Sequence, residues 1–452
     1  MNFITGNYKL LYRKFLLASV AGALVMSIYS FVDTIVIGQY EGEVGTAAMA
    51  VINPLYGTLI FLSILCGVGG AVLMGNAKGK GREEKGNAYF TAAVILGSIL
   101  TITAWIVLFF FHQQIFTFFG ADQSLMPKVM EYAKWIVYFA PVFIIPAFLG
   151  SFIRNDGAPK LVMWAVIIGG CINIFLDWFL VFPLDMGMEG AALATVSGTI
   201  IQILIMSTHF FRKKCKLRLV LPHKTLKALY KILIIGFGAS VLELGTIFLA
   251  IVMNNQIMKY GGESALAVYG VVGTISMLFQ AIFAGVGQAI QPLVSANYGA
   301  MQEKRIKSFW RRGLITVIIF GVIFMVIGEL FPEGIVRLFI DVSKTPDTLI
   351  IAPSIIRPYF LLFPFLGISV LSTYYLQSIM RGKMSLLIAL LRSIILSGAF
   401  LYLLPLVLDL NGVWIALPLS EIIVTTISII YIYTSPIKFK KEPPKDLSSL
   451  KS

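Results

Sequence analysis

Two aspartates lie inside stretches of sequence that are otherwise apolar enough to sit in lipid. Asp177 is in the run GGCINIFLDWFLVFP, residues 169–183, and Asp33 is near the end of the first apolar run. A charged side chain near the centre of a bilayer costs about 3 kcal/mol or more, so carboxylates within membrane spans are rare and mark ion or substrate pathways. The two aspartates therefore indicate a site that binds a proton or a cation.

Three more polar residues fall at related depths. Asn173 precedes Asp177 by four residues and Tyr29 precedes Asp33 by four, so each pair shares one helix face. At about 1.5 Å rise per residue, Asp33, Asp177 and Thr195 lie about 7 to 9 Å inside the outer boundary. The sequence predicts an ion-coupling cluster of these five side chains, with Tyr29 and Asn173 one turn deeper.

The chemistry of this cluster suits either a shared proton or a small hard cation such as Na⁺. Two carboxylates that approach each other do not both ionise cheaply, and Na⁺ prefers oxygen ligands. We expect no cofactor and no firm metal site, with Na⁺ at Asp33 and Asp177 as the one candidate. The alternative for each aspartate is structural: Asp33 could end a helix near the interface, and Asp177 could hydrogen-bond a neighbouring span.

A further acid, Glu243, lies near the middle of another apolar run, and Gln280 and Gln288 lie on the next one. A carboxylate at the midplane would attract cationic ligands, and the 34 phenylalanines and 17 methionines could supply adaptable apolar walls. We expect these three residues to line a cavity for small organic cations, although Glu243 could equally have a structural role.

The elements that must position these residues are membrane helices. The chain has 452 residues, of which 58% are hydrophobic, and a mean hydropathy of +0.88; soluble domains have roughly 45 to 50% apolar residues. Three single cysteines make disulfides and zinc sites improbable. We expect an all-α polytopic protein of the lipid bilayer with twelve spans, at about 14–38, 47–76, 88–111, 132–153, 161–183, 190–211, 231–257, 265–297, 313–331, 350–377, 385–408 and 413–434.

The net charge is +14. The distribution of the basic residues indicates the membrane topology of the chain rather than a nucleic-acid-binding surface. Lysine and arginine collect in alternate connections, such as 78–85 and 212–231, whereas 39–46, 184–189 and 409–411 have none. By the positive-inside rule, both termini are in the cytoplasm. We expect a multi-pass protein of the plasma (inner) membrane with no nucleic-acid partner.

The chain contains an internal repeat. Residues 67–71 read GVGGA and residues 285–289 read GVGQA, and other glycines and prolines recur at corresponding positions. This divides the chain into an N-lobe (1–211), a cytoplasmic linker (212–230), a C-lobe (231–434) and a basic cytoplasmic tail (435–452). Because each half has six spans, the halves enter the membrane in the same sense. Such repeats, related by a pseudo-two-fold axis along the membrane normal, are typical of transporters.

The GVG elements are not phosphate loops. Neither follows a strand, and no GxxxxGK[ST] motif occurs, so we expect them to pack membrane helices closely. Without a nucleotide site, transport would be driven by an ion gradient or by a partner subunit. The repeat also bears on Asp177, because its counterpart in the second half is Ala399; the fold itself does not require a carboxylate there.

These residues resemble a known family. FVDTIVIG at 31–38, NIFLD at 173–177, GAA at 190–192 and the doubled GVG element are similar to the multidrug and toxic compound extrusion (MATE) family. The resemblance covers nearly the whole chain. It implies two six-helix lobes around a V-shaped cleft, and antiport of H⁺ or Na⁺ inward against organic cations outward.

The resemblance also implies residue roles. The N-lobe cation site of the family falls on the same Tyr29, Asp33, Asn173, Asp177 and Thr195, listed above from depth alone. Glu243 resembles an acid that some branches carry in the seventh span. The carboxylate that those branches carry in the tenth span has no match here, because residues 361–377 are uncharged.

We therefore expect a secondary active transporter, not an enzyme: a monomeric, cation-coupled antiporter that exports mostly cationic drugs and toxic compounds by alternating access. The main rival is a flippase for a lipid-linked precursor from the same superfamily, which would need an arginine-rich cleft; Arg392 is the one arginine well inside a predicted span. A membrane-embedded enzyme or a receptor-like binding protein is the remaining alternative.

Overall fold

The computed structural model describes residues 3–119, 121, 123, 125–220, 225–337, 346–437 and 439. Within its helices, the side chains outside this description are those of residues 26, 29–31, 34, 42–44, 46–47, 50, 225, 242–243, 247, 263–264, 266–267 and 346–348. All regular secondary structure in the described part of the chain is helical. The expected all-α class is confirmed.

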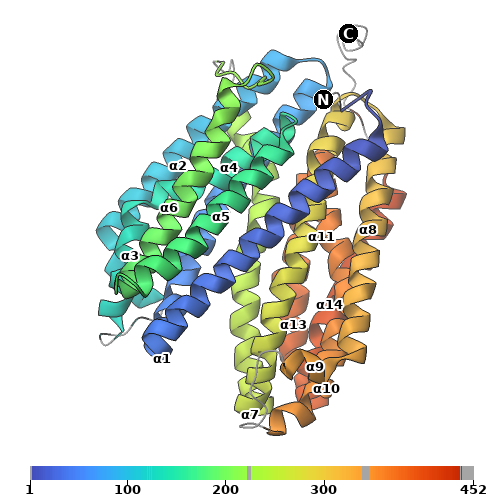
Figure 1. Ribbon diagram of the computed structural model, residues 1–452. Helices are drawn as coiled ribbons and strands as arrows, with labels where there is room; N and C mark the ends of the chain where they lie inside the picture. Colours follow the sequence, from blue (N-terminus) through green and yellow to red (C-terminus); the bar gives the residue numbers. More distant parts are fainter. Residues whose placement is uncertain are drawn as a thin grey trace.

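The helices form two lobes, coloured blue to green and yellow-green to red in Figure 1. The first lobe contains α1 (Tyr8–Gly79), α2 (Glu83–Phe118), α3 (Met126–Tyr138), α4 (Ala140–Asn155), α5 (Pro159–Val181), α6 (Gly187–Ser207) and the 3₁₀ turn Thr208–Phe211. The second contains α7 (Thr225–Gly299), α8 (Glu303–Leu330), α9 (Pro332–Arg337), α10 (Pro346–Phe360), α11 (Phe363–Ser378), α12 (Gly382–Leu390), the π-helical turn Leu391–Ile395, α13 (Leu396–Leu403) and α14 (Pro405–Thr434).

The described helices account for the predicted spans. Ten are long and apolar enough to cross a membrane, and α3 with α4, which meet at 56°, form an eleventh. The remaining predicted span, 14–38, is the first part of α1. A straight helix of the 72 residues of α1 would be about 108 Å long, against about 30 Å of hydrocarbon. The chain of α1 therefore turns back, as Figure 1 shows, and so provides two spans.

The short outer connections differ from the prediction. Residues 39–46 and 409–411 lie inside α1 and α14 rather than in loops. At Asp409, a single residue with φ 48° makes the break, and Asp tolerates this left-handed region better than most residues. At Gly45, a Cβ would come within 2.5 Å of the Glu41 Cβ. The reversal in α14 is tighter than expected because one residue in the left-handed region is enough to make it.

The two lobes pack through the glycines of the repeat. A Cβ on Gly69 would lie 2.3 Å from the carbonyl oxygen of Ile232, and a Cβ on Gly285 would lie 2.7 Å from the Cα of Val20. The GVG element of each lobe thus lies against the first span of the other lobe. The prediction that these elements are packing motifs is confirmed, and the exchange follows the expected pseudo-two-fold relation.

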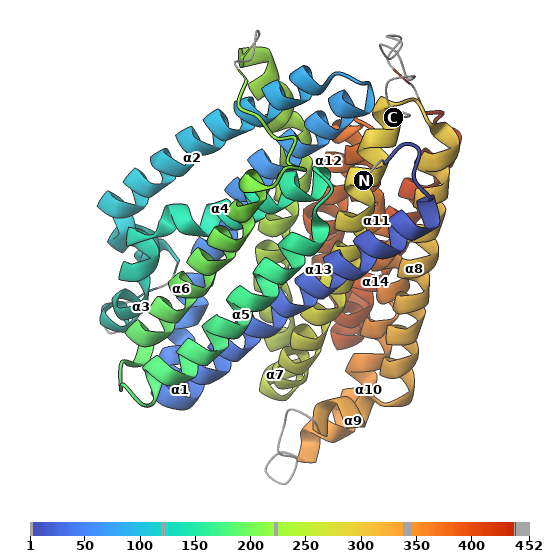
Figure 2. The same cartoon turned by 45° about the horizontal axis from the view of Figure 1, so that its top comes forward.

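The backbones of the lobes are in close contact at the end where α2 and α8 begin. A Cβ on Gly79 would lie 1.9 Å from the backbone oxygen of Ala296, and a Cβ on Gly299 would lie 2.0 Å from that of Asn76. This is also the end at which the first described residues lie, whereas the ribbons of the lobes diverge toward the opposite end (Figures 1 and 2). The backbones of the two lobes therefore meet at the predicted cytoplasmic end.

Candidate functional site

A hydrogen-bonded chain of buried side chains links four helices of the first lobe. The Tyr132 hydroxyl on α3 donates to Asp33 Oδ2 on α1 at 3.2 Å, and it lies 3.5 Å from Thr195 Oγ1 on α6. Asn173 Nδ2 on α5 donates to the same Thr195 oxygen at 3.2 Å. The structure thus brings Asp33, Asn173 and Thr195 together, as the depth argument predicts, but through a tyrosine that the prediction did not include.

Asp177 lies beside this chain without joining it. Asp177 follows Asn173 by about one turn of α5, and both are buried. Asp177 is 0% exposed and Asp33 is 7% exposed. Neither oxygen of Asp177 has a hydrogen-bond partner of normal geometry among the described residues, nor has Asp33 Oδ1 or Asn173 Oδ1. Four buried acceptor oxygens therefore converge here with few donors to satisfy them.

Glycines allow α5 and α6 to approach closely at this point. A Cβ on Gly198 would come 2.8 Å from the Asn173 Cβ, and one on Gly169 would come 2.7 Å from the Gly198 carbonyl oxygen. Any larger residue at either position would push the helices apart. The close approach holds the Asn173 amide against α6, where it reaches Thr195.

Tyr132 and Tyr56 are the members of the site that the sequence analysis missed. Tyr132 is fully buried, and its hydroxyl lies 3.2 Å from that of Tyr56 on α1. The depth argument could have found Tyr132, because it begins an inward-running predicted span and so lies near the outer boundary, like Asp33. An aromatic residue at the start of a span is usually a packing or interfacial residue, which is why its type gave no signal.

Ion pairs connect three of these helices, α1, α3 and α6, farther toward the divergent end. Lys128 Nζ on α3 lies 2.9 Å from Glu41 Oε1 on α1, and Lys134 Nζ lies 2.9 Å from Glu189 Oε2 on α6. The Trp135 indole also donates to Glu189 at 3.1 Å. Partly exposed pairs of this kind contribute little stability, but they fix α1, α3 and α6 relative to one another directly beyond the buried chain.

The structure describes the side chains of only some of the other predicted site residues. The side chains of Tyr29 and Glu243 lie outside the described residues. Gln280 and Gln288 are half-buried on α7, and no hydrogen bond among the described residues joins either one to the Asp33 cluster. The substrate cavity predicted at Glu243, Gln280 and Gln288 stays a prediction.

The second lobe contains a buried ion pair that the sequence analysis did not find. Arg392 Nε lies 2.9 Å from Glu421 Oε1, with side chains 10% and 7% exposed, and Ser369 Oγ donates to Glu421 Oε2 at 2.6 Å. Arg392 lies in the π-helical turn Leu391–Ile395, a distortion often found at functional positions. Glu421 is an acid inside a predicted span, so the rule that singled out Asp177 applies to it as well.

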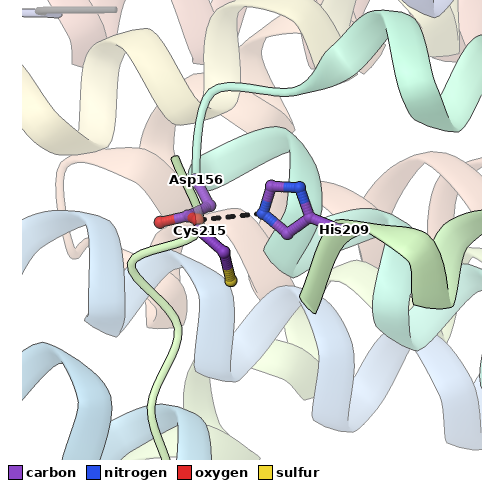
Figure 3. A group of neighbouring side chains, drawn as sticks. All are labelled: Asp156, His209 and Cys215. Atoms are coloured by element: carbon purple, nitrogen blue, oxygen red, sulfur yellow. Dashed lines mark hydrogen bonds and ion pairs between the residues drawn. The ribbon is translucent and has the colours of Figure 1, made fainter. Parts of the chain in front are cut away.

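One group of potential metal ligands occurs in the described part of the chain: Asp156, His209 and Cys215, whose ligand atoms lie within 4.8 Å of one another. Figure 3 shows the His209 ring directed at Asp156, with Cys215 beside them. The three residues come from separate segments, so no sequence spacing predicted them. Their position at the end of α4 and in the connection after α6 ties this connection to the first lobe.

The partners of Asp156 indicate a structural contact between the end of α4 and the connection after α6, rather than a metal site. Lys78 Nζ lies 3.0 Å from Oδ1, and His209 Nε2 and the Lys216 backbone nitrogen each lie 2.9 Å from Oδ2. An ammonium group on one oxygen would repel a bound cation. Burial opposes the charged form of Asp156, but the hydrogen bonds from His209 and Lys78 outweigh it and lower the pKa of this carboxyl below its ordinary value.

Comparison with known sequences identifies relatives over the whole chain. The sequence model of the family described as MatE matches residues 18–179 and 239–403. The Multidrug export protein MepA of Staphylococcus saprophyticus is 24% identical over 415 residues, covering 91% of this chain and 90% of the relative. MepA of Staphylococcus aureus is 26% identical over 428 residues, covering 93% and 92%.

Solved structures share the fold. An outward-facing multidrug resistance MATE family transporter of the MOP superfamily superposes with a TM-score of 0.89 at 21% identity, covering 97% of this chain and 98% of that one. A MOP superfamily transporter from Pyrococcus furiosus, whose binding pocket is described as of reverse polarity, also gives 0.89 at 21% identity, covering 100% and 98%. At this identity the likeness establishes the fold alone, and it agrees with the expected two lobes.

Proposed function

Because the chain belongs to the MATE family of membrane transporters, we propose that it exports organic, mostly cationic, compounds across the plasma membrane in exchange for H⁺ or Na⁺. Its relatives are named multidrug export proteins, which supports a similar range of small-molecule substrates here. We further propose that the protein acts as a monomer with both termini in the cytoplasm, as the distribution of lysine and arginine indicates.

One observation carries the ion coupling: Asp33 and Asp177 are buried together with unpartnered carboxylate oxygens. A buried carboxylate that lacks donors is costly while it is charged. A proton or Na⁺ at these oxygens would remove that cost, and Asn173, Thr195 and Tyr132 supply neutral oxygens around it. The pair is therefore the candidate ion-coupling site, and either ion satisfies its chemistry.

The position of Asp33 on α1 suggests how ion binding would reach the other lobe. The first turns of α1 pack against the second lobe: the Tyr12 hydroxyl lies 2.7 Å from Thr316 Oγ1, and Gly285 lies against Val20. A shift of α1 on ion binding would alter these contacts. If outward opening favours the ion and inward opening favours the drug, each ligand disfavours the state of the other, as reciprocal linkage requires.

The proposed substrate path runs between the lobes. Glu243 would attract cationic compounds there, and Gln280 and Gln288 would add hydrogen-bonding groups along α7. The multidrug export relatives support a path for organic cations here.

The test uses purified protein in liposomes loaded with a fluorescent organic cation. We expect transport to respond to an imposed pH gradient or to an imposed Na⁺ gradient, and Asp33→Asn and Asp177→Asn each to abolish the gradient-driven component. Asp409→Asn is the matched control, because Asp409 is exposed at a helix break and Asn tolerates the same φ. Gradient-driven transport that survives in both site variants would exclude this ion site.

A flippase for a lipid-linked precursor is the second candidate. It would need unpaired arginine in the path between the lobes to hold a pyrophosphate. The intramembrane Arg392 is instead paired with Glu421, and the first lobe presents two carboxylates. These observations favour a cationic substrate over an anionic lipid.

A further inference from the structure

A cavity opens between the two lobes at the end where their backbones meet. Its volume is about 640 Å³, and its lining comes from the end of α1 and the start of α2 in the first lobe, and from α7, α12 and α14 in the second. Figure 2 shows the starts of α2 and α12 at this end of the molecule. The cavity is therefore complete only when the lobes are together here.

The charged lining residues of the cavity are all basic: Lys80, Arg82, Lys85, Lys231, Arg381 and Lys383. No Asp or Glu is among the described residues that line it. Glu83, in the same turn as Arg82, is paired with Lys216 at 2.8 Å. The positive-inside rule explains basic loops, but not their convergence on one cavity without acids.

Backbone hydrogen-bond donors add to the positive charge of the lysine and arginine side chains. Arg82 precedes α2 and Arg381 precedes α12 as N-cap residues, and neither helix has a side-chain cap. No side chain therefore caps the N-terminal backbone donors of either helix, although Glu83 and Glu84 stand in the first turn of α2. Asn76 adds a buried Nδ2 that has no acceptor among the described residues. Donors in such an arrangement suit the several oxygens of a phosphate group.

The cavity is amphipathic. Leu73, Ala77, Ile234, Ile235, Met380 and Met384 provide apolar lining, and Tyr431 stacks against the Arg381 guanidinium at 5.1 Å. The Arg381 side chain is held by backbone oxygens of Ser435 and Pro436, and no ion pair joins it to a carboxylate among the described residues. A ligand with a phosphate and an apolar or neutral part matches both surfaces.

We propose that this cavity binds a phosphate-bearing anion, which joins the first lobe to the second at this end of the transporter. The anion is either the headgroup of an acidic phospholipid or a soluble phosphate, since both present the same oxygens. Lysines from both lobes contribute to the site: Lys85 from α2 and Lys231 from α7. Because the cavity requires both lobes, bound anion would favour the conformation that is closed here.

The experiment measures binding by the purified full-length protein in phosphatidylcholine nanodiscs with and without phosphatidylglycerol, and separately with inorganic phosphate, by shifts in apparent melting temperature and by native mass spectrometry. We expect phosphatidylglycerol to bind and stabilise the wild type more than phosphatidylcholine does. Stabilisation by inorganic phosphate alone, to the same extent, would support the proposal with a soluble anion as the ligand.

The variants test the bridge between the lobes. Each Lys contact to an anionic surface is worth about 1 kcal/mol, so Lys85→Gln together with Lys231→Gln should weaken anion binding about thirtyfold, and each single variant about fivefold. Lys213→Gln with Lys214→Gln is the control, because these lysines are exposed in the connection between the lobes. Equal loss in the control, loss from variants of one lobe only, or no preference for either anion would overturn the proposal.

Discussion

The Tyr132 hydroxyl and the Asp33 carboxylate, 3.2 Å apart, connect the bent helix pair α3–α4 to the helix that crosses from one lobe to the other. Tyr132 also approaches Thr195 and Tyr56, so one side chain connects the polar groups of three helices. Any change in the charge of Asp33 therefore acts on α3 directly. This makes Tyr132 a positioning residue for the proposed coupling ion.

We predict that Tyr132→Phe reduces ion-coupled transport by about tenfold, because a hydrogen bond to a charged group contributes about 1.5 kcal/mol or more. The ring stays in place, so the protein should fold normally. The measurement is the transport rate in liposomes as a function of ion concentration, in which the variant should reach half-maximal rate at a lower ion concentration, because the lost donor stabilised the charged, ion-free carboxylate and the ion is now released less readily. Tyr138→Phe, at an exposed position of the same helix, should behave as the wild type. Loss of the maximal rate with unchanged ion dependence would contradict a positioning role.

The second lobe provides a prediction about stability. In Glu421→Gln, Arg392 loses its carboxylate while it stays about nine-tenths buried, and breaking a buried pair costs about 3 kcal/mol or more. We expect a clear fall in the apparent melting temperature in detergent.

The control for the buried pair is an exposed one. Glu329 and Arg357 are 3.9 Å apart and about half exposed, so Glu329→Gln should change stability by less than about 1 kcal/mol. Replacing both Arg392 and Glu421 with apolar residues should recover much of the loss, because the unpaired charge is then gone. An unchanged melting temperature in Glu421→Gln would show that the ion pair does not contribute to the stability of the fold.

Sequence alone could predict those features that depend on local periodicity and depth. The all-α class, the two lobes and the convergence of Asp33, Asn173 and Thr195 all follow from helix rise and from the direction of each span. Tyr132 was missed because an aromatic residue at the start of a span is usually a packing or interfacial residue, so its type gave no signal.

Contacts between distant segments were beyond the sequence argument. His209 and Cys215 reach Asp156 only because the connection after α6 folds back over the end of α4. Glu421 is a different case: it satisfied the rule for intramembrane acids, and its partner Arg392 was already noted. What the sequence could not supply was the pairing, which depends on how α14 lies beside the π-helical turn.

Asp156 provides a prediction about pH. Its folded-state pKa is lowered because hydrogen bonds from His209 and Lys78 outweigh burial, so its charged form stabilises the fold above the unfolded pKa of about 3.9. This contribution is fully present at neutral pH and is lost as the pH falls through the lower folded value. We predict that Asp156→Asn lowers the apparent melting temperature at pH 7 and that the difference from wild type shrinks below about pH 4.

The measurement is thermal unfolding in detergent across that pH range, with Glu83→Gln as the control. Glu83 forms a largely exposed pair with Lys216 on the same side, so its loss should have little effect at any pH. A difference between Asp156→Asn and wild type that is independent of pH would contradict the electrostatic explanation and point to packing alone.

The last prediction concerns the contact between the lobes. A Cβ on Gly236 would lie 1.8 Å from the backbone oxygen of Leu65, whereas one on Gly270 of the same helix would meet nothing within 4 Å. Gly236→Ala must therefore push α7 away from α1, and overpacking of this kind costs about 1 to 3 kcal/mol. Gly270→Ala should be neutral or stabilise the helix by up to about 1 kcal/mol.

Each variant adds one methyl group to α7, so the comparison between them isolates the effect of the contact between the lobes. Apparent melting temperatures report the stability of each variant. Because this contact lies toward the end with the basic cavity, Gly236→Ala should also weaken binding of the phosphate-bearing anion, while Gly270→Ala leaves it unchanged. Equal stability and equal anion binding in the two variants would mean that α1 and α7 can separate here at no cost, and the lobes would then not be held together by this glycine contact.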